Sequence, residues 1–127
     1  MKHIFVTQRV DISNTNERRD ALDQRWYLML HRLGILPILM PNNLTVCSEL
    51  LSTFFVDGVL LTGGNDLIAY GGDAPERDLV ENSVLEWAIK NGVPLLGVCR
   101  GMQIICNHFG VSLQNVSGHV NVRHSLS

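Results

Sequence analysis

The chain has 127 residues, a length typical of one domain with its own hydrophobic core. Its formal net charge is −2 at pH 7 and it has no run of lysine or arginine, which argues against a nucleic-acid-binding surface. No apolar stretch is long enough to span a membrane, no signal peptide is recognisable, and the three cysteines lack the spacing of a disulfide framework. We therefore expect a cytoplasmic protein with reduced thiols and a single domain over residues 1–127.

The N-terminal region predicts a strand, a loop and an amphipathic helix. His3–Thr7 is a short run of β-branched and aromatic residues and predicts the first strand, whereas Gln8–Asn16 is polar and predicts a loop. A helix is expected from about Asp20 to a glycine cap at Gly34. Its apolar face is formed by Leu22, Trp26, Met29, Leu30 and Leu33.

A second strand and a short helix follow. Ile35–Met40 is apolar, and Pro37 within it predicts an edge or irregular strand because proline cannot donate to a neighbouring strand. After Asn43 the pattern predicts a helix on which Cys47 is a buried, unreactive thiol. The residues expected on the apolar side of this helix are Val46, Leu50 and Phe54.

The middle of the chain predicts a buried strand, a glycine-containing loop and a longer helix. Val56–Leu61 forms the strand, and Thr62–Asp66 forms the loop that leaves it. The helix is expected at Leu79–Asn91, since Asp78 and Glu81 have the spacing of a capping box at its start.

The most informative stretch surrounds Cys99. Pro94–Val98 predicts a buried strand and Arg100–Phe109 a helix, and Cys99 lies between them with Gly97 and Gly101 two residues away on either side. This Gly-x-Cys-x-Gly pattern is typical of a nucleophile elbow, a sharp strand-to-helix turn that leaves little room for side chains near the nucleophile. A helix N-terminus favours a thiolate, and the backbone N–H after the nucleophile is placed to stabilise an oxyanion.

Strands and helices alternate along the whole chain, with a fifth strand expected at Ser112–Val116, which predicts a parallel α/β sheet. Ligands of such sheets lie beyond the carboxyl ends of the strands. This rule brings together Thr7–Arg9, Thr62–Gly64 and Cys99. The two glycines of Thr62–Gly64 suit a second oxyanion donor; a phosphate cradle is disfavoured because no Lys-Ser/Thr follows, and a plain turn remains an alternative.

Several motifs in chain order together resemble one known family. They are Thr62-Gly63-Gly64-Asn65-Asp66, Tyr70-Gly71, Pro75-Glu76-Arg77-Asp78 with Glu81, and Gly97-Val98-Cys99-Arg100-Gly101-Met102-Gln103. The combination resembles the class I glutamine amidotransferase-like superfamily, and within it the γ-glutamyl hydrolase (peptidase C26) branch. The resemblance implies a flavodoxin-like three-layer α/β sandwich with a mainly parallel sheet and a Cys-His-Glu triad.

The resemblance also implies roles for individual residues. Cys99 matches the nucleophile, and the backbone N–H groups of Gly64 and Arg100 match the oxyanion donors. The substrate-binding positions by resemblance are Gly63, Gln103, Arg77 and Asp78. No metal and no cofactor are implied. The implied partners are a small γ-glutamyl substrate and either a second copy of the chain or a synthase.

One departure from the family is important. Members carry a His-x-Glu or His-x-Gln motif further along, whereas neither His119 nor His124 is followed two residues later by an acid or a glutamine. The chain is therefore expected to be a truncated form or a degenerate member that lacks the catalytic His/acid segment and leaves apolar surface uncovered. Residues 1–127 alone are expected to be inactive or to stop as an acyl-enzyme.

The resulting hypothesis is cysteine-dependent hydrolysis of a γ-glutamyl amide through a thioester, with release of glutamate. The polar segment with Arg9, Arg18 and Arg19 resembles that of members that act on nucleotide-linked amidates, although Arg18 and Arg19 are better explained as solvated charges at the start of a helix. The alternatives are a glutaminase component that supplies ammonia to a synthase, and a non-catalytic binding module on the same fold.

Overall fold

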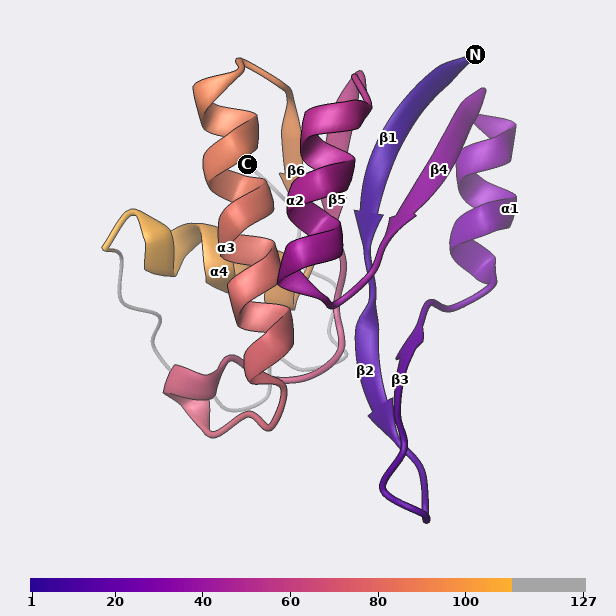
Figure 1. Ribbon diagram of the computed structural model, residues 1–127. Helices are drawn as coiled ribbons and strands as arrows, with labels where there is room; N and C mark the ends of the chain where they lie inside the picture. The colour runs from indigo at the N-terminus through magenta and orange to yellow at the C-terminus, as the bar shows by residue number, and fades with distance from the viewer. Residues whose placement is uncertain (111–127) are drawn as a thin grey trace, which may run out of the picture.

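A parallel four-stranded sheet in the order β4-β1-β5-β6 organises the chain (Figure 1). The computed structural model describes residues 1–110. The strands are β1 (Lys2–Thr7), β4 (Ile35–Met40), β5 (Gly58–Leu61) and β6 (Leu95–Gly97). The predicted parallel α/β fold is therefore confirmed, and so is the edge position of the strand that contains Pro37.

Within the described residues, four α-helices connect the strands and cover the sheet. They are α1 (Arg25–Arg32), α2 (Leu44–Thr53), α3 (Pro75–Lys90) and α4 (Arg100–His108), with a short 3₁₀ helix η1 at Ile68–Tyr70. Figure 1 shows α2 and α3 side by side on one face of the sheet, and α1 next to the edge strand β4.

Alternating side chains of the strands build a core on each face. Phe5 of β1 and Leu61 of β5 pack with residues of α2, α3 and α4 in one cluster. The adjacent residues of the same strands, Val6 of β1 and Leu60 of β5, point to the opposite face and pack against Leu30 of α1 in a second cluster. This alternation follows from the two-residue period of a strand, and it fixes the register that aligns the strand ends.

The segment predicted as a polar loop is instead the first half of a β-hairpin. Strand β2 (Arg9–Ile12) pairs antiparallel with β3 (Arg18–Ala21), and Figure 1 shows this hairpin beyond the carboxyl end of β1. The prediction was wrong because the hairpin has almost no apolar face: of its strand residues only Val10 is buried. Because β3 occupies Arg18–Ala21, helix α1 begins only at Arg25, later than the apolar periodicity predicted.

Two details of the predicted helices are corrected. In α2 the buried side chains are Cys47 and Leu51, whereas Val46 and Phe54 are exposed. Helix α3 begins at Pro75, one turn earlier than expected, because proline fits the first turn of a helix. The proposed capping box is thus wrong: Asp78 and Glu81 lie inside α3.

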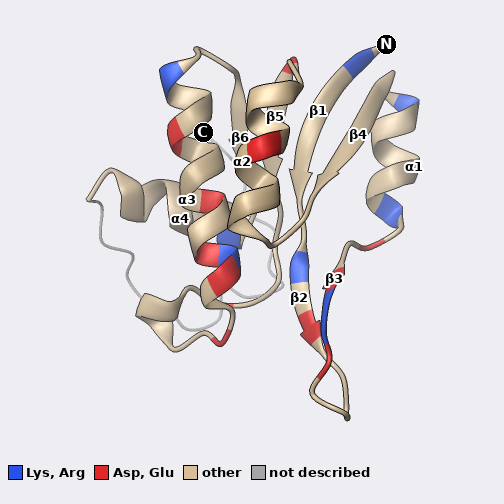
Figure 2. Cartoon of the chain, viewed as in Figure 1, with Lys and Arg blue, Asp and Glu red and all other residues tan. Residues whose placement is uncertain are grey.

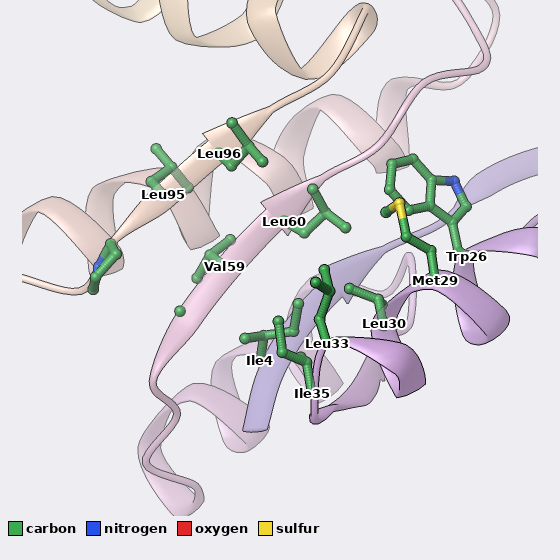
Figure 3. A pocket seen from close by; sticks show the side chains of 12 residues that line it. Ile4, Trp26, Met29, Leu30, Leu33, Ile35, Val59, Leu60, Leu95 and Leu96 are labelled. Atoms are coloured by element: carbon green, nitrogen blue, oxygen red, sulfur yellow. The ribbon is translucent and has the colours of Figure 1, made fainter. Parts of the chain in front are cut away.

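An apolar groove of about 290 Å³ lies on the α1 side of the sheet, where no helix of residues 1–110 covers β5 and β6. Figure 3 shows side chains of α1, β1, β4, β5 and β6 facing this groove, among them Trp26, Leu33 and Leu96. Leu33 is 65% and Leu96 63% exposed. The expected uncovered apolar surface is present in the part of the chain that the structure describes.

Some sequence-based expectations fall outside the described residues, namely the strand at Ser112–Val116 and the region of His119 and His124. Among residues 1–110, none of the helices combines the length and the apolar character needed to cross a bilayer.

Candidate active site

Cys99 lies on a sharp turn between β6 and α4, as the elbow pattern predicts. Its backbone has φ 53° and ψ −108°, a strained region for a residue with a side chain, and it occupies the N-cap position of α4. The side chain is exposed. A strained backbone that presents a thiol to solvent at a helix N-terminus is the arrangement of a nucleophile elbow.

The two glycines around Cys99 are required by close packing. A Cβ on Gly101 would lie 2.2 Å from the carbonyl oxygen of Leu61, and a Cβ on Gly97 would lie 2.5 Å from the carbonyl carbon of Gly101. The first turn of α4 therefore packs in direct contact with the backbones of β5 and β6, and a side chain at position 97 or 101 would prevent this contact.

A hollow of about 250 Å³ opens beside the thiol at the carboxyl edge of the sheet. It is lined by Gly64, Asn65, Asp66, Cys99, Arg100 and Gln103. Thr62–Gly64 and Cys99 are adjacent there, since a Cβ on Gly63 would lie 3.4 Å from the Cβ of Cys99. Arg9 of the first strand's end lies against Gly64, where a Cβ would come within 2.9 Å of the Arg9 Cβ. The three predicted segments therefore meet.

Two backbone donors at this hollow are free. Among residues 1–110, neither the N–H of Gly64 nor that of Arg100 donates a hydrogen bond. The amide oxygen of Gln103 is buried and has no hydrogen-bond partner in the same range. Polar groups in such positions are normally satisfied, so these three are available to a ligand.

The loop with Gly64 is held from the hairpin side by Asn65. Its side-chain oxygen accepts a hydrogen bond from Val10 N–H at 2.8 Å, and its side-chain nitrogen donates to Val10 O at 2.9 Å. Asn65 thus pairs with β2 as a neighbouring strand would, although its own φ is 52°. This contact connects the otherwise polar hairpin to the site.

Arg77 holds the same loop through hydrogen bonds to its backbone carbonyls. Its side chain is fully buried and donates from Nη2 to Thr62 O at 2.8 Å, and from Nη1 to Gly63 O at 3.0 Å and Gly64 O at 2.6 Å. A guanidinium offers five donors in a rigid fork, which suits an array of successive carbonyls.

Three further charged groups surround Arg77. Glu81 accepts from Arg77 and from Arg100, and Asp78 accepts from Arg100. Figure 2 shows basic and acidic segments adjoining where α3 passes α4. Burial lowers the pKa of Arg77 and raises the pKa of Glu81, while their pairing opposes both shifts. Two cations and two anions balance, so the buried cluster is neutral overall.

The predicted site residues thus divide into two groups. Cys99, Gly64, Arg100 and Gln103 line the hollow, with Gly63 directly behind Cys99. Arg77 and Asp78, the other residues expected to bind substrate, do not line the hollow: Arg77 donates to the Gly64 carbonyl and Asp78 accepts from Arg100.

Three residues at or near the site were not expected from the sequence: Asn65 and Asp66, which line the hollow, and Glu81, which is buried behind it. Asn65 and Asp66 follow the glycine pair directly, and polar residues at a strand end are a usable signal. Glu81 was interpreted as a helix cap, although its spacing of four from Arg77 also indicates an ion pair within a helix.

A parallel α/β sheet with a thiol at a nucleophile elbow agrees with the class I glutamine amidotransferase-like superfamily, to which the Peptidase C26 family belongs. The sequence model of the Peptidase C26 family matches residues 5–125, so the chain belongs to that family.

Known relatives agree with this membership. A γ-glutamyl-CDP-amidate hydrolase of Campylobacter jejuni is 29% identical over 92% of this chain and 60% of its own length. A putative glutamine amidotransferase of Schizosaccharomyces pombe is 40% identical over 49% of this chain and 29% of its own length. A glutamine-hydrolysing GMP synthase of Wolbachia pipientis is 29% identical over 65% of this chain and 15% of its own length. The chain spans at most 60% of the length of these relatives.

The cysteines should differ sharply in reactivity. Cys47 is fully buried, and burial raises the pKa of its thiol to about 11. At neutral pH we expect iodoacetamide to alkylate Cys99 and to leave Cys47 intact, as mapped by peptide mass spectrometry. Because the pKa is raised from 9.0, Cys47 stabilises the fold below that pH and this contribution is lost as the pH rises through about 11.

Alkylation in denaturant, where every cysteine is exposed, provides the reference for complete labelling. Modification of Cys47 at the rate of Cys99 in the folded protein would contradict the assignment.

Proposed function

We propose that the protein cleaves a γ-glutamyl amide bond through a thioester on Cys99. The observation that supports this proposal most is the exposed thiol on a strained turn, in a hollow with the N–H groups of Gly64 and Arg100, which have no hydrogen-bond partner among residues 1–110. A non-catalytic binding module has no need of a strained backbone at this position.

In the first step the Cys99 thiolate attacks the γ-carbonyl carbon, and the carbonyl electron pair moves to oxygen. The N–H groups of Gly64 and Arg100 stabilise this oxyanion, each contributing about 3 kcal/mol to the transition state. The intermediate then collapses to a thioester and expels the amine, which must take up a proton. Water finally attacks the thioester and releases glutamate and the thiol.

The hollow also offers groups that suit the glutamyl moiety. The amide of Gln103 has an unpartnered buried oxygen, which can accept a hydrogen bond from the substrate. Asp66 lines the same hollow and places a carboxylate near the α-ammonium group of a glutamyl substrate.

No histidine within residues 1–110 lines the hollow, so that part of the chain supplies no proton donor for an amine leaving group. The relatives extend beyond the matched part, and we assign proton transfer to a further part of the whole protein. Residues 1–127 alone should then form the thioester only from a substrate whose leaving group needs no proton.

This difference gives the test of the proposal. The γ-(p-nitrophenyl) ester of glutamate loses p-nitrophenolate without protonation, whereas γ-glutamyl p-nitroanilide does not lose its amine in that way. Residues 1–127 should release one equivalent of p-nitrophenolate in a burst and no p-nitroaniline. Absence of a burst contradicts the proposal, and steady turnover of the anilide contradicts the assigned origin of the proton donor.

For the leaving group we favour a nucleotide-linked amine. One relative is named a γ-glutamyl-CDP-amidate hydrolase. In this chain Arg9 lies against Gly64 with its side chain 52% exposed, and its only ion pair within residues 1–110 is to the exposed Asp11 at 2.8 Å. An exposed guanidinium next to Gly64, which lines the same hollow as the thiol, suits a diphosphate group.

Arg9→Ala should therefore weaken recognition of a diphosphate without affecting the thiol. CDP should protect Cys99 from iodoacetamide, and the variant should need an about 10-fold higher CDP concentration for the same protection. Arg19→Ala provides a matched control, since Arg19 is on the same hairpin and pairs with Glu17 at 3.1 Å. Equal protection of the Arg9 variant and the wild type would contradict the role of Arg9.

The similarity to GMP synthases favours a second candidate, a glutaminase that supplies ammonia to a synthase. Glutamate release by the whole protein from glutamine, compared with release from a γ-glutamyl phosphoramidate, distinguishes the two candidates. A preference for glutamine supports the glutaminase.

A further inference from the structure

One buried carboxylate contacts both Arg77, which holds the Gly63–Gly64 loop, and Arg100, which lines the hollow. Glu81 is fully buried, and its oxygens accept from Arg77 Nε at 3.2 Å and Arg77 Nη2 at 3.3 Å. The same carboxylate accepts from Arg100 Nη1. Glu81 thus connects the loop after β5 to the first turn of α4, two segments that are far apart in the sequence.

On the loop side, Arg77 determines where the Gly64 N–H points. In a trans peptide the C=O of one residue and the N–H of the next point in opposite directions. The carbonyl of Gly63 is bound by Arg77 Nη1 at 3.0 Å, so the N–H of Gly64 in the same peptide plane points away from Arg77. Rotation of this peptide would break that hydrogen bond, one of those that the fully buried guanidinium makes with successive carbonyls of the loop.

On the helix side, Arg100 is the first residue of α4, and its own backbone N–H is the second donor. Its side chain is 2% exposed and is held by Glu81 and Asp78. These contacts fix the first turn of α4 relative to α3. The position of the Arg100 N–H is therefore tied to the same carboxylate as that of Gly64.

We infer that Glu81 is a positioning residue that sets the separation and direction of the two oxyanion donors, with Arg77 and Arg100 as the intermediates. The inference rests on the function proposed above. Such placement must be accurate, since a displacement of about 1 Å at a catalytic group costs about 100-fold in rate. Glu81 never touches the substrate, and its contribution is made through the backbone N–H groups.

The inference is tested by Glu81→Gln in residues 1–127, with Glu86→Gln as a matched control on the exposed side of α3. The burst rate constant at saturating γ-(p-nitrophenyl) glutamate should fall about 100-fold in the Glu81 variant, with little change in the concentration that gives half the maximal rate. The rate of Cys99 alkylation by iodoacetamide, which needs no oxyanion donor, should stay within about twofold. The Glu86 variant should match the wild type in both rates.

A merely structural role predicts a different pattern, in which both reactions change together or neither changes, and either result overturns the inference. Asp78→Asn provides a second variant in case Glu81→Gln does not fold, because Asp78 is partly exposed and pairs with Arg100. Its other contact, the hydrogen bond accepted from Ile68 N–H at 3.0 Å, can be kept by the asparagine oxygen. It should lower the burst rate constant severalfold and leave alkylation unchanged; an unchanged burst overturns the inference.

Amide NMR separates this inference from the proposed function. The ¹H–¹⁵N resonances of Gly64 and Arg100 should shift in Glu81→Gln and stay in place in Glu86→Gln, whether or not the ester reacts. Without a wild-type burst the proposed function fails, and these shifts still decide whether Glu81 positions the two amides. Unshifted Gly64 and Arg100 resonances in a folded Glu81 variant overturn the inference.

Discussion

Replacing Cys99 by serine should abolish the p-nitrophenolate burst, lowering its rate by at least about 10³-fold. A serine hydroxyl is a poor nucleophile unless a base removes its proton, and no histidine of residues 1–110 lines the hollow. A stopped-flow measurement of p-nitrophenolate release compares the two proteins.

Cys106→Ser is the matched control for this experiment. Cys106 lies on the same helix and is partly exposed, but it does not line the hollow. The Cys106 variant should keep the full burst. A burst that survives in Cys99→Ser and disappears in Cys106→Ser would show that Cys106 is the nucleophile and would contradict the proposal.

Replacing Gly101 by alanine should have the largest effect on stability. The added Cβ would lie 2.2 Å from Leu61 O and 2.8 Å from Leu61 Cβ, so α4 must move away from β5. We expect the free energy of unfolding to fall by about 3 kcal/mol or more, measured by urea denaturation. Because α4 carries Arg100 and follows Cys99, the burst should disappear as well.

Gly92→Ala separates this clash from the general effect of losing a glycine. Gly92 has φ +65°, but a Cβ there would meet nothing within 4 Å. Only the backbone strain of a left-handed residue remains, which costs about 1 kcal/mol. If both variants lose the same stability, the close contact of α4 with β5 is not what requires glycine at position 101.

The sheet, its parallel direction and the elbow were predictable because local patterns determine them. A short apolar run such as Val59–Leu61, closed by Gly63 and Gly64, has the length of a buried strand and is too short for a buried helix, and Pro37 restricts its strand to an edge. The glycines around Cys99 indicate a place where two backbones touch, and the structure shows both contacts. These features are visible in short stretches of sequence.

The hairpin and the charged cluster were not predictable because their stabilising contacts join distant segments. The strands β2 and β3 are polar, and β2 is held by Asn65, which lies 55 residues after Val10. Glu81 has the spacing of a helix cap, and only its contact with Arg100, 19 residues away, shows its actual surroundings. The spacing of four between Arg77 and Glu81 indicates their ion pair, but nothing local to Glu81 indicates its contact with Arg100.

The central claim is that the Cys99 sulfur carries the γ-glutamyl group. The most direct test is to quench residues 1–127 in acid during the ester reaction and to locate the adduct by peptide mass spectrometry. The account predicts one glutamyl group, bound to Cys99 and released by neutral hydroxylamine as a thioester should be. A glutamyl group on any other residue, or unmodified Cys99 after a full burst, would contradict it.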